Sequence, residues 1–212
     1  MENLLTLKEM KDKYIYYPHK SVRNEKDRLN YNNMFELRDH YINKYGFVGL
    51  CKEFIDELYD LVKGKNILGV MSGTGYIEAY LKEKGASIKA TDSGAYLNYI
   101  DFSWDKHIYT DVETIDASKA VDKYHDWADM VIMSWPPYSN NSAYKVAVEC
   151  HKYNIPIIYL GENMTGCTAD DSFFDYVYSN GDMEECTDDY FRFFGIYDNP
   201  YLITWSDSSE TK

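Results

Sequence analysis

Asn66-Ile67-Leu68-Gly69-Val70-Met71-Ser72-Gly73-Thr74-Gly75 is the stretch from which the expected fold follows. Its apolar part, residues 67–71, has the length of a strand, and the helix-like residues 76–81 come directly after the glycines. We therefore predict a strand, a tight turn and the start of a helix. Because glycine has no Cβ and accepts positive φ, a turn through Gly73 and Gly75 lets a ligand approach the backbone and the first free N–H groups of the helix.

An acid follows at the place where a nucleotide-binding fold uses one. Asp92 ends the next apolar segment, residues 86–91, and comes 17 residues after Gly75. In a fold of this kind an acid at the end of the second strand binds ribose hydroxyls. The glycines alone would also be explained by close packing of strand against helix, but together with Asp92 they favour a nucleotide site.

The composition limits the possible classes of protein. A chain of 212 residues with 45% hydrophobic residues can bury one sizeable core, and we expect one main domain. The net charge of −13 opposes binding to nucleic acid unless a local basic patch overcomes it. The most basic segment lies between residues 19 and 38, and it is either a solvated surface helix or a substrate-facing arm. Its cationic residues are Lys20, Arg23, Lys26, Arg28 and Arg38.

Neither metal binding nor export is indicated. The cysteines, Cys51, Cys150, Cys167 and Cys186, are widely spaced and form no C-x-x-C pair, so we expect reduced thiols rather than a zinc site or disulfides. None of the five histidines has a ligand-like partner in the sequence, and we expect no metal site. No apolar run is long enough for a signal peptide or a membrane span, which favours a cytoplasmic location.

Helices and strands alternate along most of the chain. An amphipathic helix is expected from Phe47 to the glycine at position 64, after a helical extension or arm formed by residues 1–45. For residues 46–212 we predict an α/β, Rossmann-like domain with a seven-stranded, mostly parallel sheet and helices on both faces. The expected parallel strands are 67–71, 86–91, 109–115, 129–133 and 155–161, with helices at 76–84, 118–124, 143–150 and 170–178. The expected antiparallel C-terminal pair is 190–194 with 201–205.

The fourth expected strand ends in Ser134-Trp135-Pro136-Pro137-Tyr138. Two prolines cannot donate to a sheet, so the strand stops here in a fixed shape. Ligands of open α/β sheets lie at the carboxyl ends of the strands, which favours a binding site over a merely rigid terminus. Glu162 also follows a strand and is either a general base or a cap for the next loop.

Residues 46–205 resemble a class I S-adenosylmethionine-dependent methyltransferase, because the glycine turn, two strand-end acids and the double proline come in the family's order. The resemblance implies S-adenosylmethionine as cofactor, with Ser72, Gly73 and Gly75 beneath its methionine part. It further implies that Asp92 binds the ribose and that Asp116, followed by Ala117, contacts the adenine amine, although Asp116 would equally serve as a helix cap. The same resemblance places the strand-four end, Ser134, Trp135 and Tyr138, opposite the methyl group.

The sequence also departs from that family. Gly69 stands where the family has an acid, and Met71 where it has the first glycine. The strand-four end is similar to the Asp/Asn/Ser-Pro-Pro-aromatic motif of amino-group methyltransferases, but Trp135 replaces the polar residue and an indole can only donate. Tyr138 can still stack on a planar substrate.

Three functions follow as hypotheses. The first is methyl transfer to N or O of an unidentified acceptor, which is a small molecule, a protein or a nucleic acid. The second is binding of S-adenosylmethionine or a nucleotide without turnover. The third is amino-methylation of DNA or RNA, of the adenine N6 type.

Overall fold

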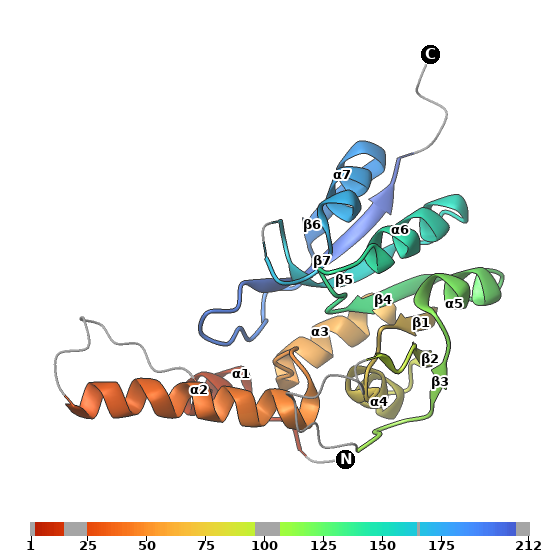
Figure 1. Ribbon diagram of the computed structural model, residues 1–212. Coiled ribbons are helices and arrows are strands. Elements are labelled where there is room, and N and C mark those ends of the chain that lie inside the picture. Colours follow the sequence, from red (N-terminus) through yellow and green to blue (C-terminus); the bar gives the residue numbers. More distant parts are fainter. Residues whose placement is uncertain (1–2, 15–24, 96–106, 165, 207–212) are drawn as a thin grey trace.

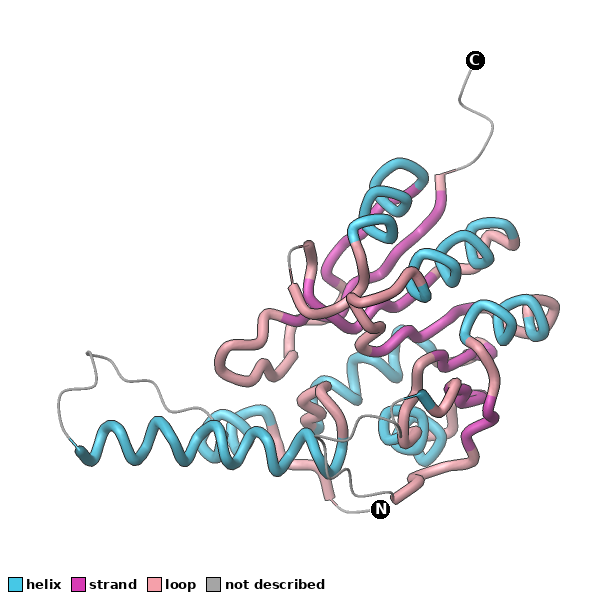
Figure 2. Tube along the Cα trace, in the orientation of Figure 1, coloured by secondary structure: helices cyan, strands magenta, loops and turns pink. Residues whose placement is uncertain are grey.

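The computed structural model describes residues 3–14, 25–95, 107–164 and 166–206, with the side chains of residues 25–32 excluded. Within this part, the strands β1 (Asn66–Val70), β2 (Ser87–Asp92), β3 (Val112–Thr114), β4 (Met130–Ser134), β5 (Ile157–Glu162), β6 (Gly181–Glu185) and β7 (Asp198–Trp205) form one sheet. Their order across the sheet is β3-β2-β1-β4-β5-β7-β6. Figure 1 shows the path of the chain, and Figure 2 shows the strands as a twisted central layer between helices.

The sheet is parallel apart from its C-terminal strands. β2 and β4 both pair with β1 in parallel, and β3 and β5 extend the sheet in the same direction. β7 runs antiparallel to both β5 and β6. The predicted Rossmann-like α/β fold with an antiparallel C-terminal pair is thus confirmed. The strand order reverses between β1 and β4, and in open α/β sheets ligands bind in the crevice at such a switch point.

Helices cover both faces of the sheet, as predicted. In chain order they are α1 (Leu7–Tyr14), α2 (Glu25–Tyr45), α3 (Lys52–Val62), α4 (Tyr76–Glu83), α5 (Ala117–Tyr124), α6 (Ser142–Lys152) and α7 (Asp171–Asn180). Alternate residues of one strand face opposite ways, so Ile67 packs in a cluster with α3 and α4, whereas Leu68 packs in a cluster with α5, α6 and α7. Burial of an aliphatic side chain such as these contributes about 1.5–3 kcal/mol.

The predicted first strand of the C-terminal pair is wrong. Residues 190–194 form no strand, and the partner of β7 is Gly181–Glu185, which has the polar sequence GDMEE. β6 is an edge strand with mostly exposed or half-buried residues, so it carries no apolar pattern that the sequence would reveal. Phe191 and Phe193, only 1% and 2% exposed, instead pack into the core against Tyr14, and Phe193 also contacts Tyr41.

The helix predicted from Phe47 begins later. α3 starts at Lys52, with Cys51 as its N-cap in extended conformation. Gly49 forms an isolated bridge with Phe191, and a Cβ at Gly49 would lie only 2.5 Å from the Phe191 ring. The apolar residues before Cys51 therefore belong to an extended segment whose spacing happens to match a helix. The third predicted strand, 109–115, is likewise shortened to Val112–Thr114.

The N-terminal helices share a core with the rest of the chain. Met10, Tyr14 and Tyr41 lie in the same cluster of buried residues as Leu50 and Phe54. The backbone N–H of Lys52 donates to the carbonyl of residue 5 at 2.9 Å, which ties the N-terminal segment to the start of α3. The division into residues 1–45 and 46–212 remains a prediction. Figure 1 shows the N-terminal half of α2 extending beyond the rest of the fold.

Some predictions fall on residues outside the described part. They are those for Lys20 and Arg23 and for the side chains of Lys26 and Arg28. Arg38 is described, and its guanidinium donates to the Asp39 carboxylate and to the Phe194 carbonyl. None of the helices within the described ranges has the length and apolar character that crossing a membrane requires.

Candidate functional site

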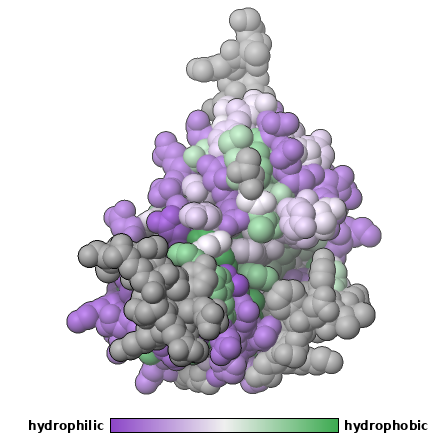
Figure 3. Space-filling model, turned by 60° about the vertical axis from the view of Figure 1, so that its left-hand side comes forward, coloured by the Kyte–Doolittle hydropathy of each residue, from purple (hydrophilic) through white to green (hydrophobic). Residues whose placement is uncertain are grey.

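A cavity of about 410 Å³ lies at the carboxyl ends of β1, β2 and β4. Its volume falls within the range of about 300–1,000 Å³ that is typical of small-molecule sites. Figure 3 shows the molecule from this side, with hydrophobic residues in the middle of the face and polar residues around them. The described lining comprises Tyr45–Val48, Met71–Thr74, Tyr76, Ile77, Asp92, Ser93, Ala95, Ser134–Asn140 and Cys167.

The glycine turn forms one wall of the cavity. Gly73 and Gly75 have φ of 54° and 72°, in the left-handed region that favours glycine. A Cβ at Gly73 would meet nothing within 4 Å, whereas one at Gly75 would lie 2.7 Å from Thr110 Cγ2. Gly73 therefore faces open space, while Gly75 permits close packing and is not part of the described lining. Met71 is also in the left-handed region, at φ 56°. For a residue other than glycine this backbone conformation costs about 1–3 kcal/mol.

The amides of the turn are already used within the protein. Ser72 N donates to the Thr91 carbonyl at 3.1 Å, and Gly75 N donates to the Ser72 carbonyl at 2.8 Å. Gly73 N donates to Asp92 Oδ2 at 2.8 Å. A phosphate needs free donors of this kind, so these three amides offer it little.

Asp92 is held at the end of β2 with its carboxylate in the cavity wall. Besides the bond from Gly73, its Oδ1 accepts from Gly94 N at 2.7 Å. Burial raises the pKa of the carboxyl group, and the two backbone donors partly offset this. Each carboxylate oxygen has a further lone pair, so Asp92 can still accept hydrogen bonds from ligand hydroxyls.

The end of β4 forms the opposite wall. Trp135 has φ 47°, and its indole stacks on Phe47 with ring centroids 4.3 Å apart and an angle of 12° between the planes. Its Nε1 donates to Asp198 Oδ2 at 3.0 Å, and Tyr190 donates to the same oxygen at 2.6 Å. Asp198 is 1% exposed, and burial raises its pKa to about 6. The indole is thus a fixed aromatic wall whose donor is already used.

Ser134 and Tyr138 also reach the cavity. Tyr138 is 63% exposed and lies at the rim. The segment is fixed on its other side, because Ala169 N donates to the Pro136 carbonyl at 2.9 Å and Pro137 forms a bridge with Thr168. The sequence motif therefore lies where ligands are expected, with its shape set by the following loop.

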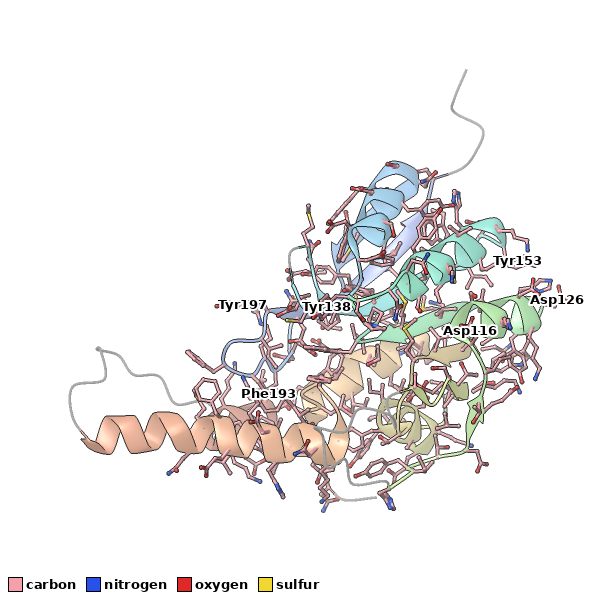
Figure 4. The ribbon with its side chains drawn as sticks, viewed as in Figure 1. Asp116, Asp126, Tyr138, Tyr153, Phe193 and Tyr197 are labelled. Carbon is pink, nitrogen blue, oxygen red and sulfur yellow. The ribbon has the colours of Figure 1, made fainter. Side chains whose placement is uncertain are left out.

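Asp116 and Ala117 are not among the residues that line the cavity. Asp116 is exposed and caps α5, with its Oδ1 accepting from Ser118 N at 3.1 Å and Lys119 N at 3.4 Å. Figure 4 shows it beside α5 and well apart from Tyr138. The alternative of a helix cap is what the structure supports, and contact with an adenine amine remains a prediction.

Glu162 is a cap rather than a cavity residue. It is buried, and its carboxylate accepts from Tyr197 N at 2.8 Å and from Cys167 N. Figure 4 shows Tyr197 on the loop that leads into β7. Both carboxylate oxygens thus hold loops in place, so the alternative of a general base has no support here.

The charges around the cavity restrict its ligand. Among the described lining residues none is Lys, Arg or His, and Asp92 is the one residue with a formal charge. Phosphates and carboxylates would therefore find no counter-charge there. A ligand with hydroxyl groups and a neutral or positive charge fits better. Within the described ranges no three His, Cys, Asp or Glu side chains gather as metal ligands.

Three residues of this region were not singled out from the sequence. Phe47 and Asp198 act on Trp135 from 88 and 63 residues away, so no local pattern connects them. Glu78, in the first turn of α4, is 1% exposed, and neither carboxylate oxygen has a hydrogen-bond partner. A signal did exist for Glu78, because an isolated glycine in a strand, here Gly69, indicates a close approach by another part of the chain.

No family model and no curated protein matches the sequence. Solved structures with a similar chain path include that of magnesium protoporphyrin IX methyltransferase from Synechocystis PCC 6803 with bound S-adenosylmethionine. It has 12% sequence identity and a TM-score of 0.48, and the alignment covers 88% of this chain and 100% of that one. A TehB-like S-adenosylmethionine-dependent methyltransferase from Corynebacterium glutamicum has 16% identity and TM-score 0.49, with 86% and 100% covered. The tRNA (uracil-54, C5)-methyltransferase of Pyrococcus abyssi has 18% identity and TM-score 0.45, with 71% and 36% covered. These are likenesses of fold.

Proposed function

We propose that this protein is an S-adenosylmethionine-dependent methyltransferase that acts on N or O of a small, planar, uncharged acceptor. The observation that carries the proposal is the cavity at the strand switch point, in which Asp92 is the one charged residue of the described lining. The cofactor is an adenosine with two ribose hydroxyls, a positive sulfonium, and an amino acid end that carries an ammonium and a carboxylate, so its net charge is positive. A site with one acid, no basic residue in its described lining and aromatic side chains in its walls therefore fits this cofactor.

The residues fit the cofactor in separate ways. Asp92 has lone pairs left for the ribose hydroxyls, because its two backbone bonds occupy one position on each oxygen. The open side of Gly73 leaves room beside the turn. Ser134 and the double-proline corner would then face the reacting atoms from β4.

When bound, the cofactor would supply an electrophilic methyl group: a lone pair of the acceptor would form the new bond to carbon, the C–S bond would break with its electrons going to sulfur, and the acceptor proton would leave to solvent. The chain's own residues contribute alignment, which can account for most of the acceleration of a two-reactant step. Trp135 and Phe47 offer a flat wall, fixed through Asp198, and Tyr138 stands at the rim for a planar acceptor.

Calorimetry with S-adenosylmethionine and with its demethylated product, S-adenosylhomocysteine, tests cofactor binding. We expect micromolar to submillimolar affinity, reduced at least tenfold in Asp92→Ala. The absence of binding of either compound at millimolar concentration would refute the proposal. Asp182→Ala is the control, because Asp182 is an acid of the edge strand β6 and lies outside the described cavity lining.

Binding without turnover is the second candidate, favoured by the engaged Trp135 indole and by Met71 at positive φ. Incubation of a lysate with methyl-labelled cofactor separates the two, since any labelled product that depends on the protein excludes a silent binder. Labelled DNA or RNA would identify the third hypothesis, nucleic-acid amino-methylation. The absence of Lys and Arg from the described lining does not favour it.

A further inference from the structure

Glu78 is an acid buried behind the glycine turn. It lies in the first turn of α4, is 1% exposed, and both of its carboxylate oxygens lack a hydrogen-bond partner. The Ser72 hydroxyl is also buried and has no partner of hydrogen-bond geometry. A buried carboxylate without a partner is costly, and proteins retain one where a ligand or a reaction uses it.

The carboxylate fills the space above Gly69. A Cβ at Gly69 would collide with Glu78 Oε1 and would lie 2.8 Å from Ser72 Oγ. Gly69 thus has no side chain of its own at the end of β1, and its place is taken by an acid that reaches across from the helix. Position 69 is also where the resemblance to methyltransferases leads one to expect an acid.

Glu78 is close to the cavity without lining it. Ser72 connects them, because it belongs to the described cavity lining and its hydroxyl lies near the same position above Gly69 as the Glu78 carboxylate, whose pKa it lowers. On the other side Asp92, at the end of β2, is near enough to disfavour a second negative charge. No described Lys, Arg or His forms an ion pair with Glu78, so the positive partner of these two acids is missing from the described protein.

We propose that Glu78, acting through Ser72, forms the subsite for the positively charged part of the ligand, in place of the acid that is absent at Gly69. This rests on the proposed function, in which the ligand has a sulfonium and an amino group. Glu78 is accordingly a positioning residue that favours cationic ligands by its charge. The Glu78 carboxylate occupies the space that the side chain of an acid at position 69 would enter.

Three ligands differ in charge but share adenosine and sulfur. S-Adenosylmethionine has a sulfonium, an amino group and a carboxylate, S-adenosylhomocysteine has the amino group and the carboxylate, and 5′-methylthioadenosine has no charged group. In calorimetry with the wild-type protein we expect affinity to fall in that order. Decarboxylated S-adenosylmethionine, which has both positive groups and no carboxylate, separates the effect of positive charge from that of the carboxylate. In Glu78→Gln we expect S-adenosylmethionine to bind at least tenfold more weakly, while 5′-methylthioadenosine changes less than twofold.

The transposed double variant Gly69→Asp with Glu78→Ala supplies the decisive control. It returns the acid to the strand and removes the Glu78 atoms that a Cβ at Gly69 would meet, and the Ser72 hydroxyl, the remaining close neighbour at 2.8 Å, can rotate away. We therefore expect affinity for S-adenosylmethionine within threefold of the wild type. Glu78→Ala alone should behave like Glu78→Gln. Equal weakening of all three ligands in Glu78→Gln, without rescue by the double variant, would show a purely structural role and overturn the proposal.

The outcomes also separate this proposal from the general function. If no adenosine compound binds the wild type, the methyltransferase proposal itself fails. If decarboxylated S-adenosylmethionine and 5′-methylthioadenosine bind the wild type equally well, the methyltransferase proposal survives but Glu78 has no role towards positive charge. That comparison needs no variant, so it decides the matter even if Glu78→Gln does not fold.

Discussion

Replacing Glu78 by Gln should make the stability of the protein less sensitive to pH. Burial raises the pKa of this carboxyl group from its ordinary value of 4.5 to about 7, and the Asp92 charge adds to the effect. The folded state therefore holds the proton more tightly than the unfolded state. Stability from this group is fully present below pH 4.5 and is lost as pH rises through about 7.

The size of the effect follows from the shift. One unit of pKa corresponds to about 1.4 kcal/mol, so a rise from 4.5 to about 7 gives about 3 kcal/mol of lost stability at pH 8. The Gln side chain removes the titration but keeps the shape, and its buried amide adds an offset that does not vary with pH. The free energy of unfolding of Glu78→Gln minus that of the wild type should therefore rise by about 3 kcal/mol between pH 4 and pH 8.

Urea denaturation of both proteins at several pH values from 4 to 8.5 measures this difference. Asp198, whose pKa burial raises to about 6, titrates in the same range but cancels in the comparison. Glu184→Gln on the edge strand β6 is the control for loss of an exposed carboxylate, and this replacement should change stability by about 0.5 kcal/mol or less. A constant difference between Glu78→Gln and wild type across the whole range would refute the buried, unpaired state of Glu78.

Three further predictions concern the cavity walls and the edge of the sheet. Asp116→Ala removes the α5 cap and should lower the free energy of unfolding, measured by urea denaturation, by about 1 kcal/mol. Its affinity for S-adenosylmethionine should change less than twofold, and a tenfold loss of affinity would support the adenine contact expected from the sequence. Trp135→Phe removes a donor to the buried Asp198 and should cost about 1–3 kcal/mol, and unchanged stability would show that Tyr190 alone satisfies the acid. Tyr138→Ala should leave stability within about 0.5 kcal/mol, because the side chain is 63% exposed, while labelling of lysate small molecules falls severalfold; full labelling would remove Tyr138 from the acceptor site.

The sequence predicted the central parallel strands because these strands are buried on both faces. β1, β4 and β5 are continuous apolar runs bounded by glycine, proline or acids, and such runs have few other interpretations. β6 was missed because an edge strand needs no apolar face. The aromatic stretch 190–194 was taken for a strand because buried loop residues and strand residues have the same composition.

The site was predictable where it is local in the chain. The glycine turn, Asp92 and the strand-four end all lie at the cavity, because the carboxyl ends of parallel strands meet at one edge. The bonds that fix Trp135 were not predictable, since Asp198 belongs to a distant strand. Glu78 reads in the sequence as an ordinary acid in the first turn of a helix, and only its contact with Gly69 distinguishes it.

The packing of the N-terminal helices against Phe191 and Phe193 has a consequence for synthesis of the protein. Tyr14 and Tyr41 leave the ribosome early, but their aromatic partners are made about 150 residues later. Synthesis adds about 5–20 residues per second. The parts of these helices that Phe191 and Phe193 cover would therefore stay uncovered for roughly 10–30 seconds. During that interval the nascent chain is open to chaperones and to misassembly.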